Sequence, residues 1–461
     1  MAFGRFEFVA TFPVMDLTIG ESTFAHVQVA EPERVAASAF DVDGLLVDTA
    51  RFAVGSIDRV GAQRGVAAPQ RSIDRSHLLA YCTTHVEVDG VAVPAWGDLS
   101  GVYPAADGRH LQIHCNFAHH AAGVVARLGC ADDRASVAAA IAERDAFQLE
   151  AELIEDGMIG AALRTLDEWN EHPHAAATRD MPLMSADRLG DADPLSAAAR
   201  DSGRDGPLAG LRVLDCSRVL AGPVAGQLLA GFGANVLRVG ADHLPSVEVG
   251  VISTGFGKHN TSIDLRTDAG RTAMEALIAD TDVWIDAYRP GALAAFGFTP
   301  ERVAALRPGI VIVQVSAFDW SGPWAGRRGF DSIVQTTTGV RWAGGEYGRD
   351  ADGHPIGTPT GLPVQALDYA TGFLAAGLAA QLVTHQRDAG GSWLGRTSLL
   401  RARNQLVAQR APAVFAPAAV SVDAMYLGSV DSQFGRVTAV RPFAGSWPAP
   451  PERLGTSASI W

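Results

Sequence analysis

Asp368 is the residue whose type and setting suit chemistry best. It directly precedes YATGFLAAGLAAQLVTH, a stretch of small and apolar residues that predicts a helix packed closely against its neighbours. A helix N-terminus offers free backbone N–H groups and a partial positive charge, which can stabilise a developing oxyanion. A carboxylate with an ordinary pKa of about 3.9 is ionised at neutral pH and can act as a nucleophile. The simpler interpretation from residue type alone is an N-cap, worth about 0.5–2 kcal/mol.

A second group of reactive side chains lies in and after the string HCNFAHH, which begins at His114. The ligand types that zinc accepts are all present, at His114, Cys115, His119, His120 and Cys130. However, His114 and Cys115 are neighbours in an expected strand and therefore point to opposite faces. The spacing also matches no zinc motif, so we expect no metal site.

The composition excludes several classes of partner. The chain has 461 residues with 37 basic and 51 acidic side chains, a formal net charge of −14, and Lys258 is its only Lys. Nucleic acids and anionic membranes need clustered Lys and Arg, so we expect neither as a partner. No segment reaches the roughly 18 apolar residues of a membrane span. The four Cys lack C-x-x-C spacing, and residues 1–16 lack a cleavage pattern, so we expect a soluble protein of the reducing cytoplasm.

Strands and helices alternate regularly in the second half, around Asp368. Short apolar runs predict strands at 211–217, 234–240, 261–265, 282–287 and 309–318. Helical spacing between them predicts helices at 224–233, 267–279 and 299–306. This alternation predicts an α/β fold with a Rossmann-like, doubly wound, mostly parallel sheet. No G-x-G-x-x-G follows the first strand, so a dinucleotide site is disfavoured.

The remaining segments predict a smaller α+β domain, a linker and a tail. Residues 188–207, RLGDADPLSAAARDSGRDGP, have linker composition and separate residues 1–187 from residues 208–413. The first part predicts an amphipathic helix at 40–60, a hairpin at 102–117 around Asp107-Gly108, and helices at 118–128 and 135–156. Residues 414–461 are rich in Pro, Ala and Val and predict an extended C-terminal tail.

Five strings of the second half together resemble the class III (CaiB/BaiF-type) CoA-transferases. These relatives include formyl-CoA transferase, carnitine CoA-transferases and α-methylacyl-CoA racemase. The strings are PLAGLRVLDCSRVLAGPVAGQLLAGFGANVLRV, GKHNTSIDLRTDAG, VWIDAYRPGALAAFGF, RPGIVIVQVSAFDWSGP and ALDYATGFLAAGLAAQL. In the first part, SGVYPAADGRHLQI and RTLDEWNEHPHAAATRDMPL resemble the family's small domain and return segment, which in the family follow the Rossmann-like half. The resemblance implies the family fold in rearranged order, as a fusion of two partial domains.

The resemblance implies that Asp368 is catalytic. In the family an Asp at this position attacks an acyl-CoA thioester, and an aspartyl-CoA thioester forms before the acceptor acid takes over the CoA. Coenzyme A is then a substrate rather than a tightly bound cofactor. The expected partners are acyl-CoA, a carboxylic acid and a second copy in a homodimer, which is interlocked in the family. The residues in or beside the matching CoA-binding segments are Leu220, Ala221, Asp264, Leu265, Arg266, Tyr288, Arg289 and Asp331.

Departures from the family pattern leave alternatives open. Gly240 and Ala241 stand where the family usually has Glu followed by Arg or Lys. The CoA phosphates need cationic partners from elsewhere, and the candidates are Arg238, Lys258, Arg266 and Arg289. Phe330 stands where the racemase branch has His, and because Phe exchanges no proton, CoA transfer is favoured. An acyl-CoA racemase or isomerase and a non-catalytic acyl-CoA-binding homologue are the alternatives.

Overall fold

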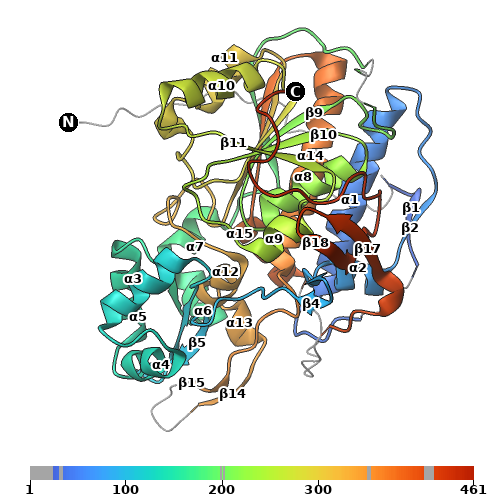
Figure 1. Ribbon diagram of the computed structural model, residues 1–461. Helices are drawn as coiled ribbons and strands as arrows, with labels where there is room; N and C mark the ends of the chain where they lie inside the picture. Colours follow the sequence, from blue (N-terminus) through green and yellow to red (C-terminus); the bar gives the residue numbers. More distant parts are fainter. Residues whose placement is uncertain (1–23, 31–34, 198–199, 201–202, 350–354, 410–419) are drawn as a thin grey trace.

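A seven-stranded sheet forms the centre of the computed structural model, which describes residues 24–30, 35–197, 200, 203–349, 355–409 and 420–461 (Figure 1). The strand order is β11-β10-β9-β12-β13-β16-β8, in which the first six strands are parallel and β8 pairs antiparallel with β16. Counted from β9, this is the Rossmann order, with the reversal between β9 and β12. The strands are β8 (Ser185–Gly190), β9 (Arg212–Cys216), β10 (Asn235–Gly240), β11 (Lys258–Ser262), β12 (Val283–Asp286), β13 (Val311–Ser316) and β16 (Ser392–Ser398).

Helices cover both faces of the sheet, as a doubly wound fold requires. One face packs against α8 (Ala221–Gly231) and α14 (Ala366–Ala389), and α1 (Val42–Ala62) packs on α14. The opposite face packs against α10 (Asp268–Ile278) and α11 (Pro300–Leu306). Thr267 and Thr299 cap α10 and α11, because each side chain accepts a backbone N–H of the first turn. The expected α/β class with a doubly wound, mostly parallel sheet is confirmed.

A smaller α+β domain lies beside the sheet, at the lower left of Figure 1. Its antiparallel strands are β5 (Gly101–Pro104), β6 (His110–Ile113) and β7 (Gly160–Ala162), and its helices are α3 (Ala118–Leu128), α4 (Arg134–Ala142) and α5 (Ala146–Glu155). The predicted hairpin at 102–117 is confirmed. The single predicted helix at 135–156 is wrong, because Asp145 accepts the N–H of Gln148 and begins a second helix.

The remaining elements connect these layers. They are β1 (Val27–Val29), β2 (Arg71–Ile73), α2 (Arg75–Tyr81), α6 (Leu166–Glu171), α7 (Pro173–Thr178), α9 (Glu248–Ser253), α12 (Asp331–Thr337), α13 (Val340–Ala343), β14 (Glu346–Arg349), β15 (Pro355–Thr358) and α15 (Leu399–Ala408). The predicted strand at 261–265 is shifted, because β11 begins at Lys258, opposite Val236 of β10, and ends at Ser262. Residues 188–190 of the predicted linker lie in β8.

The C-terminal segment, predicted as an extended tail, contains a hairpin that its composition did not indicate. Strands β17 (Leu427–Ser432) and β18 (Gly435–Val440) join β3 (Val86–Val88) and β4 (Val91–Ala92) from the first half in one sheet. After Val440 the chain has no regular element and follows β11, where the Ser459 hydroxyl lies 2.6 Å from that of Thr261. Residues 414–419 of the predicted tail and residues 1–16, which were expected to lack a cleavage pattern, lie outside the described part of the chain.

Among the described residues, α14 alone has the length and composition of a membrane span. Yet 94% of its most apolar window is buried inside the protein, as in the core helix of a folded domain. One neighbour is α1, which is buried on nearly every face rather than being amphipathic as predicted. Gly377 makes the closest approach, because a Cβ there would lie 2.3 Å from Cε1 of Phe52 and 3.0 Å from Cα of Ala53.

We expect Gly377→Ala to lower the free energy of unfolding by about 1–3 kcal/mol, because the added methyl forces α1 away from α14. Urea unfolding followed by circular dichroism measures the loss. Phe52→Leu in the same chain supplies the control, since it removes part of the ring that the methyl meets. The double variant should then lose less than the two single variants together, and strict additivity would contradict the predicted contact.

Candidate active site

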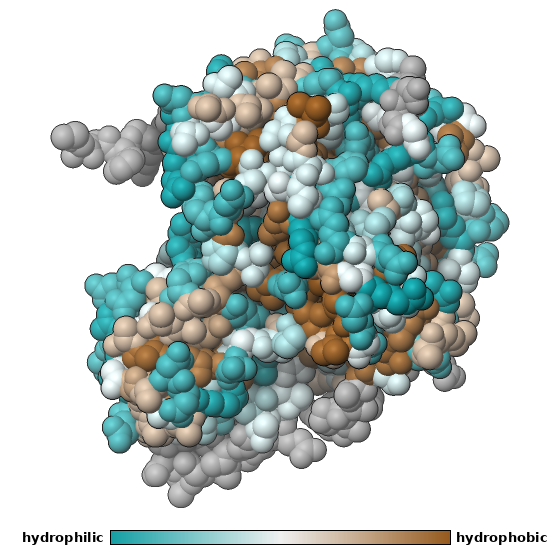
Figure 2. Space-filling view, in the orientation of Figure 1, coloured by the Kyte–Doolittle hydropathy of each residue, from teal (hydrophilic) through white to brown (hydrophobic). Residues whose placement is uncertain are grey.

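A cavity of about 460 Å³ opens at the carboxyl ends of the parallel strands. Loops after β9, β10, β11, β12 and β13 line it, so it straddles the point where the strand order reverses. Figure 2 shows the molecule hollowed between the lobe with α3 and α5 and the lobe with α10 and α11, with hydrophobic side chains gathered at the inner end. Ligands of open α/β sheets bind at this position.

Asp368 lines this cavity from the first turn of α14, with its residue 8% exposed. The helix begins at Ala366, three residues before the predicted start at Tyr369, so Asp368 is not the N-cap. Gln365 holds the cap position and its side chain makes no capping hydrogen bond. The N–H of Asp368 instead donates to Oδ2 of Asp331 at 2.9 Å. Asp331 therefore caps α14 from another helix and leaves the Asp368 side chain free for the cavity.

Asp331 is the first residue of α12 and is fully buried. It also accepts the N–H of Leu367 and an Nε2–H of Gln335. Oε1 of Gln335 accepts the N–H of Leu362 at 2.8 Å, so α12 holds the chain that enters α14 at two points. Asp331 does not line the cavity, and its predicted contact with CoA has no support in this geometry.

The two carboxyl groups perturb each other. Burial, followed by the nearby charge of Asp331, raises the pKa of Asp368 well above its usual range, and the Ala221 N–H partly offsets this rise. Burial also raises the pKa of Asp331 to about 6, with its three hydrogen-bond donors opposing the rise. Asp331 is the better stabilised anion of the two, because it accepts more hydrogen bonds.

The N-terminus of α8 meets the same carboxyl group. Ala221 is the first residue of α8, and its carbonyl oxygen would lie 2.7 Å from a Cβ at Gly372 of α14, so the two helices touch at this glycine. The loop before α8 contains Val219 with φ of 68°, a left-handed conformation that a β-branched residue rarely adopts. Such strain is typical of loops held for function. The N-terminus of α8 thus directs the Ala221 N–H toward the Asp368 carboxyl group, whereas the Leu367 and Asp368 N–H groups of α14 donate to Asp331.

Cations line the cavity although the whole chain is acidic. Its lining includes Arg218, Arg266, Arg289 and Arg328, and Arg266 pairs with Asp264 at 2.7 Å. Of the predicted CoA-binding residues, all except Asp331 lie along it, namely Leu220, Ala221, Asp264, Leu265, Arg266, Tyr288 and Arg289. Arg218 and Arg328 were missed by the sequence analysis. Arg218 lies two residues after the end of β9, and this position after a parallel strand could have indicated a place at the ligand site.

The His-rich segment forms the small-domain wall of the cavity. His119 and His120 line it, and the ring of His114 stacks on Phe330 with centroids 3.9 Å apart. Burial lowers the pKa of His114 to about 3 and that of His120 to about 4, so both rings are neutral. Within the described residues no group of three or more His, Cys, Asp or Glu side chains could hold a metal ion.

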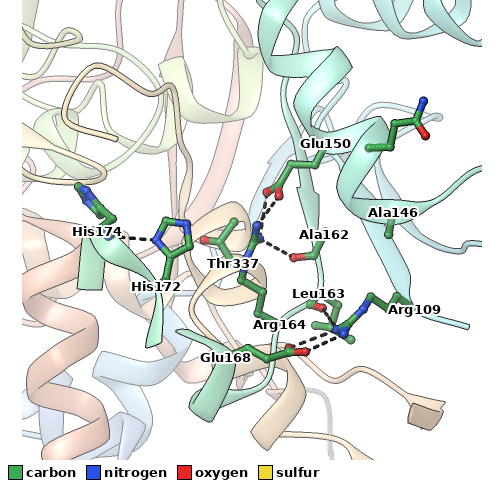
Figure 3. Close-up of polar contacts among 12 residues, drawn as sticks. Arg109, Ala146, Glu150, Ala162, Leu163, Arg164, Glu168, His172, His174 and Thr337 are labelled. Carbon is green, nitrogen blue, oxygen red and sulfur yellow. Dashed lines mark hydrogen bonds and ion pairs between the residues drawn. The ribbon is translucent and has the colours of Figure 1, made fainter. Parts of the chain in front are cut away.

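A buried ion-pair network joins the small domain to the loop that precedes Asp331. Glu150 of α5 accepts from Arg164 at 2.5 Å and from Arg327 at 2.7 Å, and all three side chains are buried (Figure 3 shows the Glu150–Arg164 pair). Nearby, Arg109 pairs with Glu168 at 2.7 Å. Removing one partner from such a network leaves an uncompensated buried charge. The small domain and the loop that precedes Asp331 are therefore held as one unit.

The fold and cavity define an α/β protein with a ligand site at the switch point of a doubly wound sheet. Residues 208–422, a little under half of the chain, match the model of CoA-transferase family III. Similar proteins include the succinyl-CoA–D-citramalate CoA-transferase of Chloroflexus aurantiacus, at 32% identity over 40% of this chain and 47% of that protein. The succinate–glutarate CoA-transferase of Agrobacterium fabrum is 30% identical over 41% of this chain and 49% of that protein.

Another match extends over more of the chain. An acyl-CoA transferase of Gibberella moniliformis is 28% identical over 73% of this chain and 65% of that protein. The chain thus spans less than two thirds of the length of each of these curated relatives. Among solved structures, a CaiB/BaiF family protein from Brucella suis is 25% identical over 44% of this chain and 56% of that chain, with a TM-score of 0.38.

We expect Asp331→Asn to change the pH dependence of stability. Folded Asp331 keeps its proton up to about pH 6, whereas an unfolded Asp loses it near 3.9, so the folded state binds more protons between these values. The resulting stabilisation is present at low pH and is lost as the pH rises through about 6. Relative to the variant, the wild type should lose about 1–3 kcal/mol between pH 4.5 and 7.5, measured by urea unfolding. A difference that stays constant with pH would contradict this assignment.

Proposed function

We propose that the protein transfers CoA between carboxylic acids through an aspartyl-CoA thioester on Asp368. The observation that supports this most directly is the buried carboxyl group of Asp368, which faces a cavity at the sheet's switch point beside two helix N-termini. The match to the model of CoA-transferase family III supports the same reaction class. Acyl-CoA and a carboxylic acid are the proposed substrates, and coenzyme A is not a tightly bound cofactor.

The proposed steps balance without a further reactant. A carboxylate oxygen of Asp368 attacks the thioester carbonyl, the C–S bond breaks, and CoA leaves as a thiolate while a mixed anhydride of Asp368 and the donor acid forms. The thiolate then attacks the Asp368 carbonyl and releases the donor acid, which leaves the aspartyl-CoA thioester. The acceptor carboxylate repeats these steps in reverse and regenerates Asp368. A thiolate suits this exchange because a thiol of pKa about 8.5 leaves far more readily than an alcohol.

The surroundings of Asp368 suit these steps. The raised pKa makes its carboxylate a stronger base and nucleophile once it is ionised. The N–H of Ala221 can donate to oxygens that become negative at each addition. Arg218, Arg266, Arg289 and Arg328 offer charge to the CoA phosphates along the cavity. The cytoplasmic location, the interlocked homodimer and the rearranged fusion stay predictions.

We expect Asp368→Asn to abolish CoA transfer and to leave the fold intact, because the side chain keeps its shape and its backbone N–H still donates to Asp331. Mass spectrometry after incubation with acyl-CoAs should show a covalent adduct on Asp368 in the wild type only. Asp268→Asn is the matched control, because Asp268 also lies in the first turn of a helix but its side chain is 96% exposed. Transfer at the wild-type rate in Asp368→Asn would overturn the mechanism. CoA binding with neither adduct nor turnover in the wild type would favour a non-catalytic acyl-CoA-binding protein.

We expect no racemisation of 2-methylacyl-CoA. A racemase needs a proton-exchanging group on each face of the α-carbon. At the relevant position this chain has Phe330, packed on neutral His114, and the adjacent Asp331 is buried with its oxygens engaged by α14 and Gln335. One stereoisomer incubated in deuterated water should keep its configuration and its α-hydrogen. Stereoinversion with solvent deuterium at that carbon would favour the racemase alternative.

A further inference from the structure

Arg238 carries a buried charge that forms no ion pair with any described residue. It lies in β10, is 9% exposed, and makes no hydrogen bond or ion pair with any described residue. Its Nη1 is among the buried nitrogens without a partner. The carboxylate beside it in register, Asp215 of β9, is already taken by Lys258 at 2.7 Å and by the Ser217 hydroxyl. A buried cation of this kind is costly unless an anion comes from outside.

Space for such an anion exists beside Arg238. A side cavity of about 260 Å³ lies where β10 and β11 end, and its lining includes Arg218, Arg238, Tyr288, Ser262 and Gly455. It is continuous with the main cavity, because Arg218, Gly240, Ala241, Leu244 and Tyr288 line both. Asp368 lines only the main cavity, so the side cavity serves a part of the ligand away from the reacting carbonyl.

Gly240 leaves the guanidinium of Arg238 accessible to a ligand in the side cavity. A Cβ at this position would lie 3.3 Å from Nη1 of Arg238, so any side chain would crowd the group. One acidic side chain, Asp242, also lines the side cavity, and it accepts a hydrogen bond from the Ser262 hydroxyl rather than from Arg238. Two guanidiniums beside a carboxylate–hydroxyl pair match a phosphate on a sugar, since guanidinium binds phosphate oxygens and a carboxylate accepts from sugar hydroxyls.

We propose that the side cavity is a phosphate subsite in which Arg238 and Arg218 bind the 3′-phosphate of CoA. The proposal rests on CoA being the substrate, as proposed above, and it names which of this chain's cations hold the nucleotide end. The C-terminal segment at Leu454 and Gly455 forms one wall of the subsite. The alternative anion, the carboxylate of an acid substrate, is distinguished by the choice of ligands.

The test compares CoA with 3′-dephospho-CoA by isothermal titration calorimetry on the full chain. The wild type should bind CoA about 10- to 100-fold more tightly, the range of a charge-assisted contact. Arg238→Gln should reduce that preference to within about threefold and leave the affinity for 3′-dephospho-CoA unchanged. Arg302→Gln is the matched control, because Arg302 lies on α11 away from both cavities and its side chain is 52% exposed; it should keep the preference.

A second variant tests the role of the glycine. Gly240→Glu places a carboxylate against the guanidinium, so it should also remove the preference for the 3′-phosphate. Arg238→Gln should also raise the Tm of the free protein, because it removes an unpaired buried charge, and this rise shows that the variant folds.

Each contrary outcome has its own meaning. A wild type that binds both ligands equally overturns the subsite and leaves CoA transfer standing, whereas one that binds neither overturns the proposed function itself. If Arg238→Gln weakens the binding of CoA and of 3′-dephospho-CoA equally, then Arg238 has only a structural role and the subsite is overturned. If simple carboxylates compete with CoA for the wild type but not for Arg238→Gln, the side cavity binds the acid substrate instead.

Discussion

The hydrogen bond from the Asp368 N–H to the Asp331 carboxylate is the contact on which the site depends. Helix α14 is buried along nearly its whole length, so its first N–H groups cannot be satisfied by water. A cap from within α14 would use a side chain at the position of Gln365, and none is made there. Because Asp331 supplies the cap from α12, the carboxyl group of Asp368 is left unengaged by its own helix and faces the cavity.

That arrangement places two carboxyl groups together in a buried setting, which has a chemical consequence. Asp331 is tied to two N–H groups and an amide, while Asp368 has one N–H, from Ala221. The negative charge is therefore better stabilised on Asp331, and Asp368 becomes the more basic partner. A nucleophile that must form and release an acyl bond benefits from this difference, since a carboxylate that is already well stabilised attacks poorly.

The resemblance to CoA-transferases named cavity residues that directly follow strands of the parallel sheet. Leu220, Asp264 and Tyr288 lie far apart in the chain, yet each follows a strand, and the carboxyl ends of parallel strands meet at one edge. The capping of α14 could not be predicted in this way, because Asp331 precedes Asp368 by 37 residues and reaches it only through tertiary packing. The His-rich segment was considered as a metal site, and its place on the cavity wall depends on how the small domain docks. No local pattern encodes that docking.

That docking explains how the first half takes part in chemistry centred on the second. Arg327 precedes Phe330 and Asp331 by a few residues, and its buried guanidinium is neutralised by Glu150 of α5. Moving the small domain would separate that pair and leave the Arg327 charge without its carboxylate, while Glu150 would keep Arg164; the loss of a buried pair costs far more than the loss of a surface contact. The position of α5 therefore fixes the loop, the loop fixes the start of α12, and Asp331 at that start fixes the backbone of Asp368. Residues before position 187 are in this sense part of the machinery that orients the proposed nucleophile, although the nucleophile itself lies on α14.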